Sequence, residues 1–334
     1  MKVLESQLLE DTDMFKEARL MFIYTETSLH AGSGTSLGVI DLPIQREKYT
    51  DYPVLQASGI KGAVRDWMET NNGSEKQKID LIFGPDTIGG GEAFSGAATF
   101  TDGRLLLFPV RSMKGVFAYT TSCFALNRLK RDLNMAKVTN ANWDVPPEPQ
   151  GNHVLGIQGS GLCEDGKILL EEYAFDFQGN NDVYKIAEWL SQNAFPNSPE
   201  YQFWKEKIKK DLVILPEDAF KDFVKLSTEV QARIKIDNET KTAATGALFY
   251  EEALTPDTFL YSVVMANDPF KDEQNRPVGL KNAKEIMNFI SNLNGKRAQF
   301  GGDTTIGRGI VNIKFFNGGN TQPNNSTSNN GGNK

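Results

Sequence analysis

The sequence predicts an α+β fold, because strand-like and helix-like segments follow one another without the regular alternation of a doubly wound parallel sheet. Two further observations favour this class. Short apolar runs meet at turn-forming pairs such as Asp102-Gly103, which is typical of hairpins. Amphipathic helical stretches, such as the one that begins at Ser58, stand in separate blocks between them. We interpret the chain as one large domain with insertions rather than as two domains.

The elements are expected in the following order. Residues 20–29 alternate as a strand does, and a helix runs from Ser58 to about Met68. A polar connection follows at 71–78, two strands at 97–110 form a hairpin, and 112–135 is helical at least in its second half. A loop rich in Pro, Gly and Asn occupies 140–161. Beyond it we expect strands at 167–177, 232–238, 246–251, 258–266, 297–300 and 308–316, and helices at 182–194, 199–210, 216–231 and 279–293.

The segment from Leu29 to Glu47 is the most informative stretch of the chain. Its sequence, LHAGSGTSLGVIDLPIQRE, combines His30, one of only two histidines, with three glycines and with Asp41, the only charge in the apolar stretch from Val39 to Ile44. A loop of this length in a compact domain is more often functional than not. Asp41 either caps a turn or is presented for chemistry, and in general the capping role is the more common.

Composition excludes several classes of protein. The 334 residues have a net charge of −7, and no apolar run approaches the roughly 18 residues that span a bilayer. Cys123 and Cys163 lack the spacing of a zinc site or a disulfide framework, which fits a reducing cytoplasm. The charge is uneven, however: residues 104–137 hold seven basic side chains against one acid, a local net of +6. This basic stripe is either a polyanion-binding surface or an ordinary solvated helix face.

A glycine cluster near the C-terminus, GGDTTIGRG at 301–309, predicts close contact between backbone and ligand. Gly301, Gly302 and Gly307 would let backbone amides approach phosphate oxygens, and Arg308 could add a bidentate charged contact. The alternative is a tight turn between two strands. Lys61 and Arg65, on one face of the helix that begins at Ser58, are either companions of this loop or ordinary surface charges.

No complete motif of a common enzyme class is present. GLCEDGK at 161–167 has the spacing of a P-loop, but Ile168 replaces the Ser or Thr that would hold magnesium, and Asp165-Gly166 fits a hairpin turn better. GSGTSLG at 32–38 lacks the dinucleotide-binding spacing. His153 stands in the Pro- and Gly-rich loop, far from His30 in sequence, so a two-histidine ribonuclease mechanism is not favoured.

Taken together, six motifs in the same order resemble a known family over nearly the whole chain. They are the Leu29–Glu47 segment, SGIKGAVRD, LIFGP, FPVRSMKGVFAYTTS with FALNRLKRDL, ARIKIDNETKTAATGALFYEE and GGDTTIGRGIV. The chain resembles the backbone subunit of type III-B CRISPR (Cmr) effectors, which are RNA-binding members of the RAMP superfamily. This resemblance implies a modified RNA-recognition-type (ferredoxin-like) core with large insertions at 19–316. It also implies a projecting thumb-like hairpin, placed here at 233–252, with the insertion at 140–170 as a competing candidate. Residues 1–18 would be an N-terminal arm and 317–334 a disordered polar tail.

The resemblance also implies a function in the cytoplasm. Copies of the chain would polymerise along a guide RNA (crRNA), beside other subunits of the effector, and each copy would cut the paired target RNA. Asp41 occupies the position of the family's cleaving aspartate. It would accept the proton of a 2′-hydroxyl or hold a divalent metal ion, Mg²⁺ or Mn²⁺, with His30 assisting at the phosphate.

Contacts with RNA would come from several places. They are expected from Lys61, Arg65, Arg111, Lys114, Gly301, Gly302, Gly307 and Arg308. The rival interpretation is a non-catalytic scaffold that binds crRNA while another subunit cuts. A free-standing nuclease that processes repeat RNA is a weaker alternative, since it would need a more elaborate acid and base set.

Overall fold

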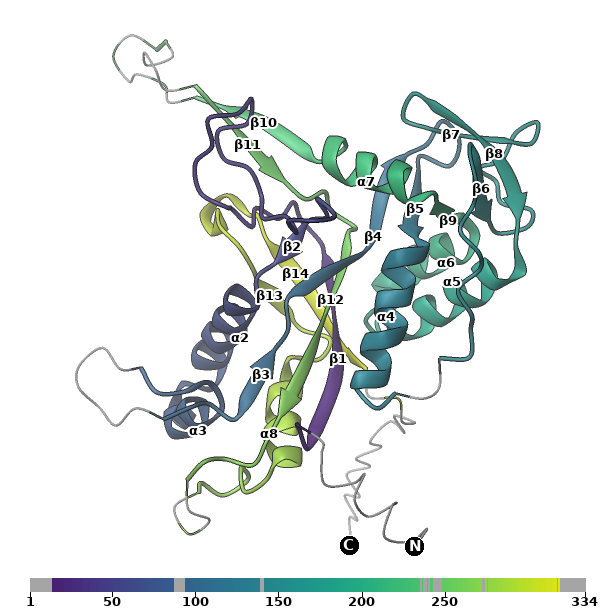
Figure 1. The fold of residues 1–334 in the computed structure, drawn as a ribbon. Helices are drawn as coiled ribbons and strands as arrows, with labels where there is room; N and C mark the ends of the chain where they lie inside the picture. Colours follow the sequence, from purple (N-terminus) through teal and green to yellow (C-terminus); the bar gives the residue numbers. More distant parts are fainter. Residues whose placement is uncertain are drawn as a thin grey trace, which may run out of the picture.

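The computed structural model has an α+β architecture, as the sequence predicts (Figure 1). It describes residues 14–86, 94–138, 141–234, 248–271 and 276–316, together with positions 236, 239, 241, 242, 274 and 318. The expected N-terminal arm and polar tail therefore lie mostly outside the described residues. Within the part of the chain that is described, no helix is long and apolar enough to cross a membrane.

One large mixed sheet forms the centre of the molecule. Its strands run in the order β13-β14-β1-β12-β4-β5-β9-β6-β8-β7, with β2 paired to β4 and β3 paired to β12. The first half is antiparallel, whereas β5–β9 and β6–β8 pair in parallel. The strands are β1 (Glu17–Thr25), β2 (Val54–Leu55), β3 (Ala98–Phe100), β4 (Gly103–Arg111), β5 (Phe117–Ser122), β6 (His153–Gly156), β7 (Lys167–Leu170), β8 (Tyr173–Gly179), β9 (Leu212–Leu215), β12 (Phe259–Ala266), β13 (Arg297–Gln299) and β14 (Ile310–Phe316).

The sheet separates two hydrophobic cores because successive side chains of a strand point to opposite faces. On β1, Met21 and Ile23 enter one core, while Leu20 and Phe22 enter the other. The first core is covered by α2 (Ala57–Asn72), α3 (Lys76–Phe83), α7 (Glu217–Leu226) and α8 (Ala283–Ile290). The second is covered by α4 (Cys123–Met135), α5 (Asn181–Asn193) and α6 (Gln202–Asp211).

A separate two-stranded hairpin leaves this body. Strands β10 (Glu229–Arg233) and β11 (Phe249–Ala253) pair only with each other in regular register, and they extend away from the main sheet (Figure 1). The loop that holds His30 and Asp41 lies along this hairpin, in the purple segment of Figure 1. Strand β10 starts at Glu229, before the predicted start at 232, and β11 starts at Phe249, after the predicted start at 246.

Two expectations about local structure are wrong, and a third is confirmed. Residues 71–78 are helical rather than a polar connection, since α2 runs to Asn72 and a 3-10 turn leads directly into α3. The helix expected in the second half of 112–135 is confirmed: α4 begins after Ser122, whose hydroxyl accepts the Ala125 amide at 3.2 Å, while strand β5 lies in the first half. The helix that starts after Pro216 ends at Leu226, five residues before the expected Gln231.

The strands at 97–110 do not form a hairpin either. Both β3 and β4 pair with β12 in the same direction, one after the other, so they are two parts of a bent strand. The Asp102 carboxylate accepts the Ala57 amide at 2.8 Å at the start of α2. A Cβ on Gly103 would lie 2.9 Å from Ile60 and 3.0 Å from Leu55. The Asp-Gly pair therefore lets α2 and β2 approach the strand closely.

The turn at Asp165-Gly166 is confirmed. Both residues have positive φ, 49° and 74°, and the flanking Glu164 and Lys167 exchange two backbone hydrogen bonds of 2.9 Å. Those are the features of a two-residue hairpin of the primed type. A phosphate-binding loop at this position is thereby set aside.

Candidate functional site

The loop with His30 and Asp41 is held against strand β11. Leu29 and Leu254 exchange backbone hydrogen bonds of 3.0 and 2.9 Å, and Leu42 does the same with β11 through Tyr250 and Glu252. Between these points the loop folds on itself, with the Ser33 amide donating to Pro43 and the Gln45 amide to Ala31. Both candidate catalytic residues, His30 and Asp41, are therefore on a loop that is held against the backbone of β11.

Asp41 is partly exposed at the outer end of this loop. Its Oδ2 accepts the backbone amide of Tyr250 at 2.7 Å, and its carbonyl oxygen accepts the Ser36 amide at 2.8 Å. The carboxylate thus anchors the loop to β11, as the capping interpretation expects. Its second oxygen, Oδ1, has no hydrogen-bond partner among the described residues.

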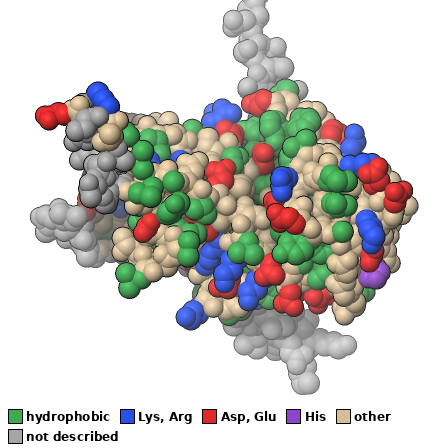
Figure 2. All heavy atoms as spheres, turned by 90° about the horizontal axis from the view of Figure 1, so that it is seen from above, with side chains coloured by type: hydrophobic (Ala, Val, Ile, Leu, Met, Phe, Trp, Pro, Cys, Tyr) green, Lys and Arg blue, Asp and Glu red, His purple; other side chains and the backbone are tan. Residues whose placement is uncertain are grey.

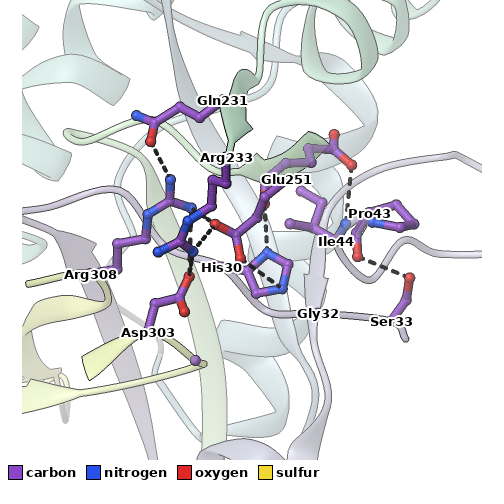
Figure 3. Close-up of polar contacts among 12 residues, drawn as sticks. His30, Gly32, Ser33, Pro43, Ile44, Gln231, Arg233, Glu251, Asp303 and Arg308 are labelled. Carbon is purple, nitrogen blue, oxygen red and sulfur yellow. Dashed lines mark hydrogen bonds and ion pairs between the residues drawn. The ribbon is translucent and has the colours of Figure 1, made fainter. Parts of the chain in front are cut away.

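His30 lies deeper, between β11 and the glycine cluster. Its Nδ1 is 2.6 Å from the carbonyl oxygen of Glu252, and its own carbonyl accepts the Gly302 amide at 2.9 Å. Its Nε2 lies 3.9 Å from Oε1 of Glu251 (Figure 3). A Cβ on Gly301 would stand 2.4 Å from the His30 carbonyl oxygen, so this close approach requires glycine.

A cavity of about 240 Å³ opens where these segments meet the start of α2. It is lined by Ala31, Gly32 and Gln45 of the loop, by Leu55, Gln56, Gly59 and Ile60 around the start of α2, and by Phe300, Gly301 and Gly302. The N-cap residue of α2, Gln56, gives no capping hydrogen bond and the first turn itself holds no acidic residue, but the Asp102 carboxylate accepts the Ala57 amide. The Ser58 and Gly59 amides have no acceptor among the described residues, so they and the helix dipole can hold an anion beside the one that Asp102 already supplies.

A buried ion-pair network ties the glycine cluster to the hairpin (Figure 3). The Glu251 carboxylate, 3% exposed, contacts Arg233 at 2.6 Å and Arg308 at 3.0 Å. Arg233 also contacts Asp303 at 3.0 Å, and Arg308 donates to Gln231 at 2.6 Å. The Arg308 side chain is buried, and its guanidinium contacts Glu251 and Gln231. In this arrangement it holds the glycine cluster against the hairpin and does not face a ligand.

A second buried carboxylate holds the other side of the loop. Glu252 pairs with Arg46, and its oxygens accept the Ile44 amide at 3.0 Å and the Thr228 hydroxyl at 2.8 Å. Neither Glu251 nor Glu252 was predicted from the sequence to be part of the site. The sequence does hold a signal for a buried acid here. Glu251 and Glu252 are adjacent in a strand that also carries Phe249 and Tyr250, and since neighbouring strand residues face opposite sides, the two acids cannot both lie on one solvent-facing side.

The other predicted RNA contacts are placed separately. Arg65 donates to Glu69, Gly84 and Asp80 at 2.8–3.1 Å, so its guanidinium is engaged between α2 and α3. Lys61 lies 3.3 Å from the Ala98 carbonyl, and burial, with a further contribution from the Arg65 charge, lowers its pKa.

The basic stripe at 104–137 is divided among acidic partners. Arg111 is paired with Glu171 and Lys114 with Glu164, both next to the β7–β8 hairpin. Arg104, Arg128 and Lys130 are paired with Asp132, Glu47 and Asp144. Of the predicted site residues, Gly301 and Gly302 line the cavity, and His30 and Arg308 lie behind them through the Gly302 amide and Glu251. Asp41 lies on the same loop but at Tyr250, and Arg65, Arg111 and Lys114 are not among the residues that line the cavity.

The donor set for a metal ion is small. Among the described residues, no three His, Cys, Asp or Glu side chains gather as a metal site. Asp41 could therefore supply one carboxylate oxygen to Mg²⁺. This ion is commonly bound by one or two carboxylates, with waters and substrate phosphates as its other ligands.

Comparison with known proteins gives concordant results. The family model of the RAMP superfamily matches residues 22–312. A protein of Pyrococcus furiosus named CRISPR system Cmr endoribonuclease Cmr4 is 39% identical over 298 residues, which cover 89% of this chain and 95% of that protein. The CRISPR system CMR subunit Cmr4 of Saccharolobus solfataricus is 25% identical over 89% of this chain and 96% of its own length.

Solved structures agree with these relatives. Oligomeric Cmr4 from Pyrococcus furiosus superposes with a TM-score of 0.69 at 32% identity, covering 90% of this chain and 98% of that one. A chain of the type III-B Cmr-beta complex bound to cognate target RNA has the same fold, with a TM-score of 0.67 at 22% identity, covering 90% and 98%.

Proposed function

The chain belongs to the RAMP superfamily and, within it, to the Cmr4 family; from this premise we propose that it is an RNA-guided endoribonuclease and the backbone subunit of a type III-B CRISPR effector. The observation that carries the proposal is that the loop holding His30 and Asp41 meets the glycine cluster at one cavity, lined by Gly32 and Gln45 on one side and by Gly301 and Gly302 on the other. The relative at 39% identity is itself named an endoribonuclease.

The core supports an RNA-recognition-type arrangement. Strands β14, β1, β12 and β4 are adjacent in that order and antiparallel, and α2 and α8 cover the same face. The β10–β11 hairpin is the better candidate for the thumb than residues 140–170, whose strands β6 and β7 are part of the main sheet. Val230, Ile234, Leu248 and Tyr250 on the hairpin are exposed apolar or aromatic side chains that suit contact with bases.

Guide RNA would bind along the cavity. Its phosphates would be held by the Gly59 amide in the first turn of α2 and by the Gly301 amide, because the Gly302 amide already donates to His30. Lys61, Arg65, Gly307, Arg111 and Lys114 would add contacts along the path of the RNA. Arg308 would act indirectly, by holding the glycine cluster through Glu251.

Cleavage would use the 2′-hydroxyl of the target as nucleophile, giving a 2′,3′-cyclic phosphate and a 5′-hydroxyl. Asp41 would accept the proton of that hydroxyl through its free oxygen, while Tyr250 fixes the carboxylate. His30 would orient the phosphate. A divalent ion held by Asp41 and the RNA, if bound, would lower the pKa of the hydroxyl.

A scaffold without its own catalysis is the second candidate, because the Asp41 carboxylate already has a structural role at Tyr250. The Asp41→Asn variant separates the two. Asparagine keeps an oxygen that can accept the Tyr250 amide but removes the charge, so guide binding and target capture should be retained. Cleavage should fall by about 100-fold or more, the scale of a lost general base.

The assay is incubation of guide-loaded assemblies with end-labelled complementary RNA. The unmodified protein should give evenly spaced fragments, and His30→Ala should slow cleavage less than Asp41→Asn does. Cutting that stops in EDTA would assign Asp41 to a metal ion, whereas slow cutting in EDTA would assign it to proton transfer alone. Normal cutting by Asp41→Asn with both RNAs bound would favour the scaffold.

A further inference from the structure

A second concave surface lies far along the sheet from the cavity at His30, between α7 and the β7–β8 hairpin. Two adjoining hollows of about 470 and 210 Å³ share Tyr173, Asp222 and Phe223, so they form one continuous groove. Phe175 and Phe223 are buried in its floor, with ring centroids 6.1 Å apart. Tyr173 is 57% exposed and Leu226 73% exposed at its edge.

The rim of this groove is acidic. Glu148, Glu172, Asp218 and Asp222 line it and are exposed. Among the described residues, no cation contacts the carboxylates of Glu172, Asp218 or Asp222. Glu171, which also lines the groove, is paired with Arg111 at 3.0 Å.

The acidic and basic side chains of helix α7 lie on different faces of the helix. Asp218, Asp222 and Leu226 follow one another at intervals of four residues, so they form one stripe along the groove. Lys225 pairs with Asp51 at 3.1 Å, away from that stripe. Asp218 lies in the first turn of α7, where the helix dipole favours a carboxylate, whereas Asp222, four residues on, gains little from the dipole and is repelled by Asp218, so a cation from outside would stabilise the stripe.

These features exclude RNA as the natural occupant, because a polyanion would be repelled by the rim. They favour a polypeptide that carries lysines or arginines with apolar side chains between them, since aromatic floors and charged rims are typical of protein interfaces. This chain has a net charge of −7 and its arginines already have acceptors within it, so a second copy would meet the acidic rim with like net charge, which favours a different, basic protein.

We propose that the groove between α7 and the β7–β8 hairpin is a docking site for a basic, apolar-bearing segment of a different protein. Figure 2 looks onto this end of the molecule, where hydrophobic and acidic side chains lie next to one another on the surface. The proposal does not depend on Asp41 or on cleavage, so its failure would leave the nuclease function untouched.

The test uses the full chain and three fluorescein-labelled pentapeptides. The first alternates lysine with phenylalanine and leucine; the second replaces its lysines with glutamate; the third replaces its apolar residues with serine. Fluorescence anisotropy compares the unmodified protein with Asp218→Asn/Asp222→Asn. The matched control is Asp66→Asn/Asp165→Asn, which removes two exposed carboxylates elsewhere.

The first peptide should bind the unmodified and control proteins more tightly than the other two peptides do. The Asp218→Asn/Asp222→Asn variant should bind it about fivefold more weakly, as expected for two exposed ion pairs. Equal binding of the acidic peptide, or an unchanged affinity in that variant, would overturn the proposal. So would self-association, measured by light scattering, that this variant alone abolishes, because the occupant would then be a second copy.

Discussion

Replacing Gly301 by alanine tests whether the glycine cluster positions His30. Gly301 has a φ of +75°, and a Cβ there would stand 2.4 Å from the carbonyl oxygen of His30 and 3.0 Å from its carbonyl carbon. These are backbone atoms, fixed in turn by the Gly302 amide and by the bonds of Leu29 to β11. The clash therefore cannot be relieved by rotation of a side chain, and the loop must move.

Gly295→Ala is the matched control, because Gly295 has a nearly identical φ of +71° and open space around its Cα. The left-handed conformation costs alanine about 1–2 kcal/mol. The reduced entropy of the unfolded chain returns about 0.4–1 kcal/mol. The control should thus lower the free energy of unfolding by about 1 kcal/mol, and Gly301→Ala by a further 1–3 kcal/mol from overpacking, a total of about 2–4 kcal/mol.

Urea denaturation of both variants measures this difference, and target cleavage measures its consequence for His30. Gly301→Ala should also slow cleavage, because the displaced backbone carries His30 away from the cavity. If the two variants unfold within about 0.5 kcal/mol of each other, the contact between Gly301 and His30 does not exist as described. Equal destabilisation with a loss of cleavage only in Gly301→Ala would place the effect on RNA binding instead.

Three further predictions concern other parts of the chain. Asp268→Asn should cost about 0.5–2 kcal/mol at neutral pH, because the carboxylate contacts Lys16 at 2.6 Å and accepts the Ala283 amide at the start of α8. The Lys16 hydrogen bond lowers the pKa of Asp268, so this stabilisation is present above the unfolded-state pKa and is lost as pH falls through the folded-state value; the variants should converge in acid denaturation. Ending the chain at Asn317 should leave thermal stability and guide binding unchanged, and a large loss of either would show that the tail docks. Neutralising Arg111 and Lys114 together should weaken RNA binding and reduce its salt dependence; weaker binding with an unchanged salt slope would assign them to folding, through Glu171 and Glu164.

Local patterns predicted much of the fold. The α+β class, the helix after Ser58 and the Asp165-Gly166 turn follow from periodicity and turn chemistry, which act over a few residues. The same local logic was wrong at Asp102-Gly103. That pair is equally suited to a hairpin and to the bend that admits α2, and only the packing of β12 against both β3 and β4 decides between them.

The sequence by itself identified the two segments that we propose to meet RNA, the Asp41 loop and the glycine cluster, from their composition and from the resemblance. Only the tertiary structure decided how they are held. Arg308 and Glu251 are 57 positions apart in sequence, and no local pattern tells an arginine that faces a phosphate from one that is buried against a carboxylate. Once folding has brought β10, β11 and the glycine cluster together, the buried Glu251 requires a cationic partner, and Arg308 and Arg233 supply it.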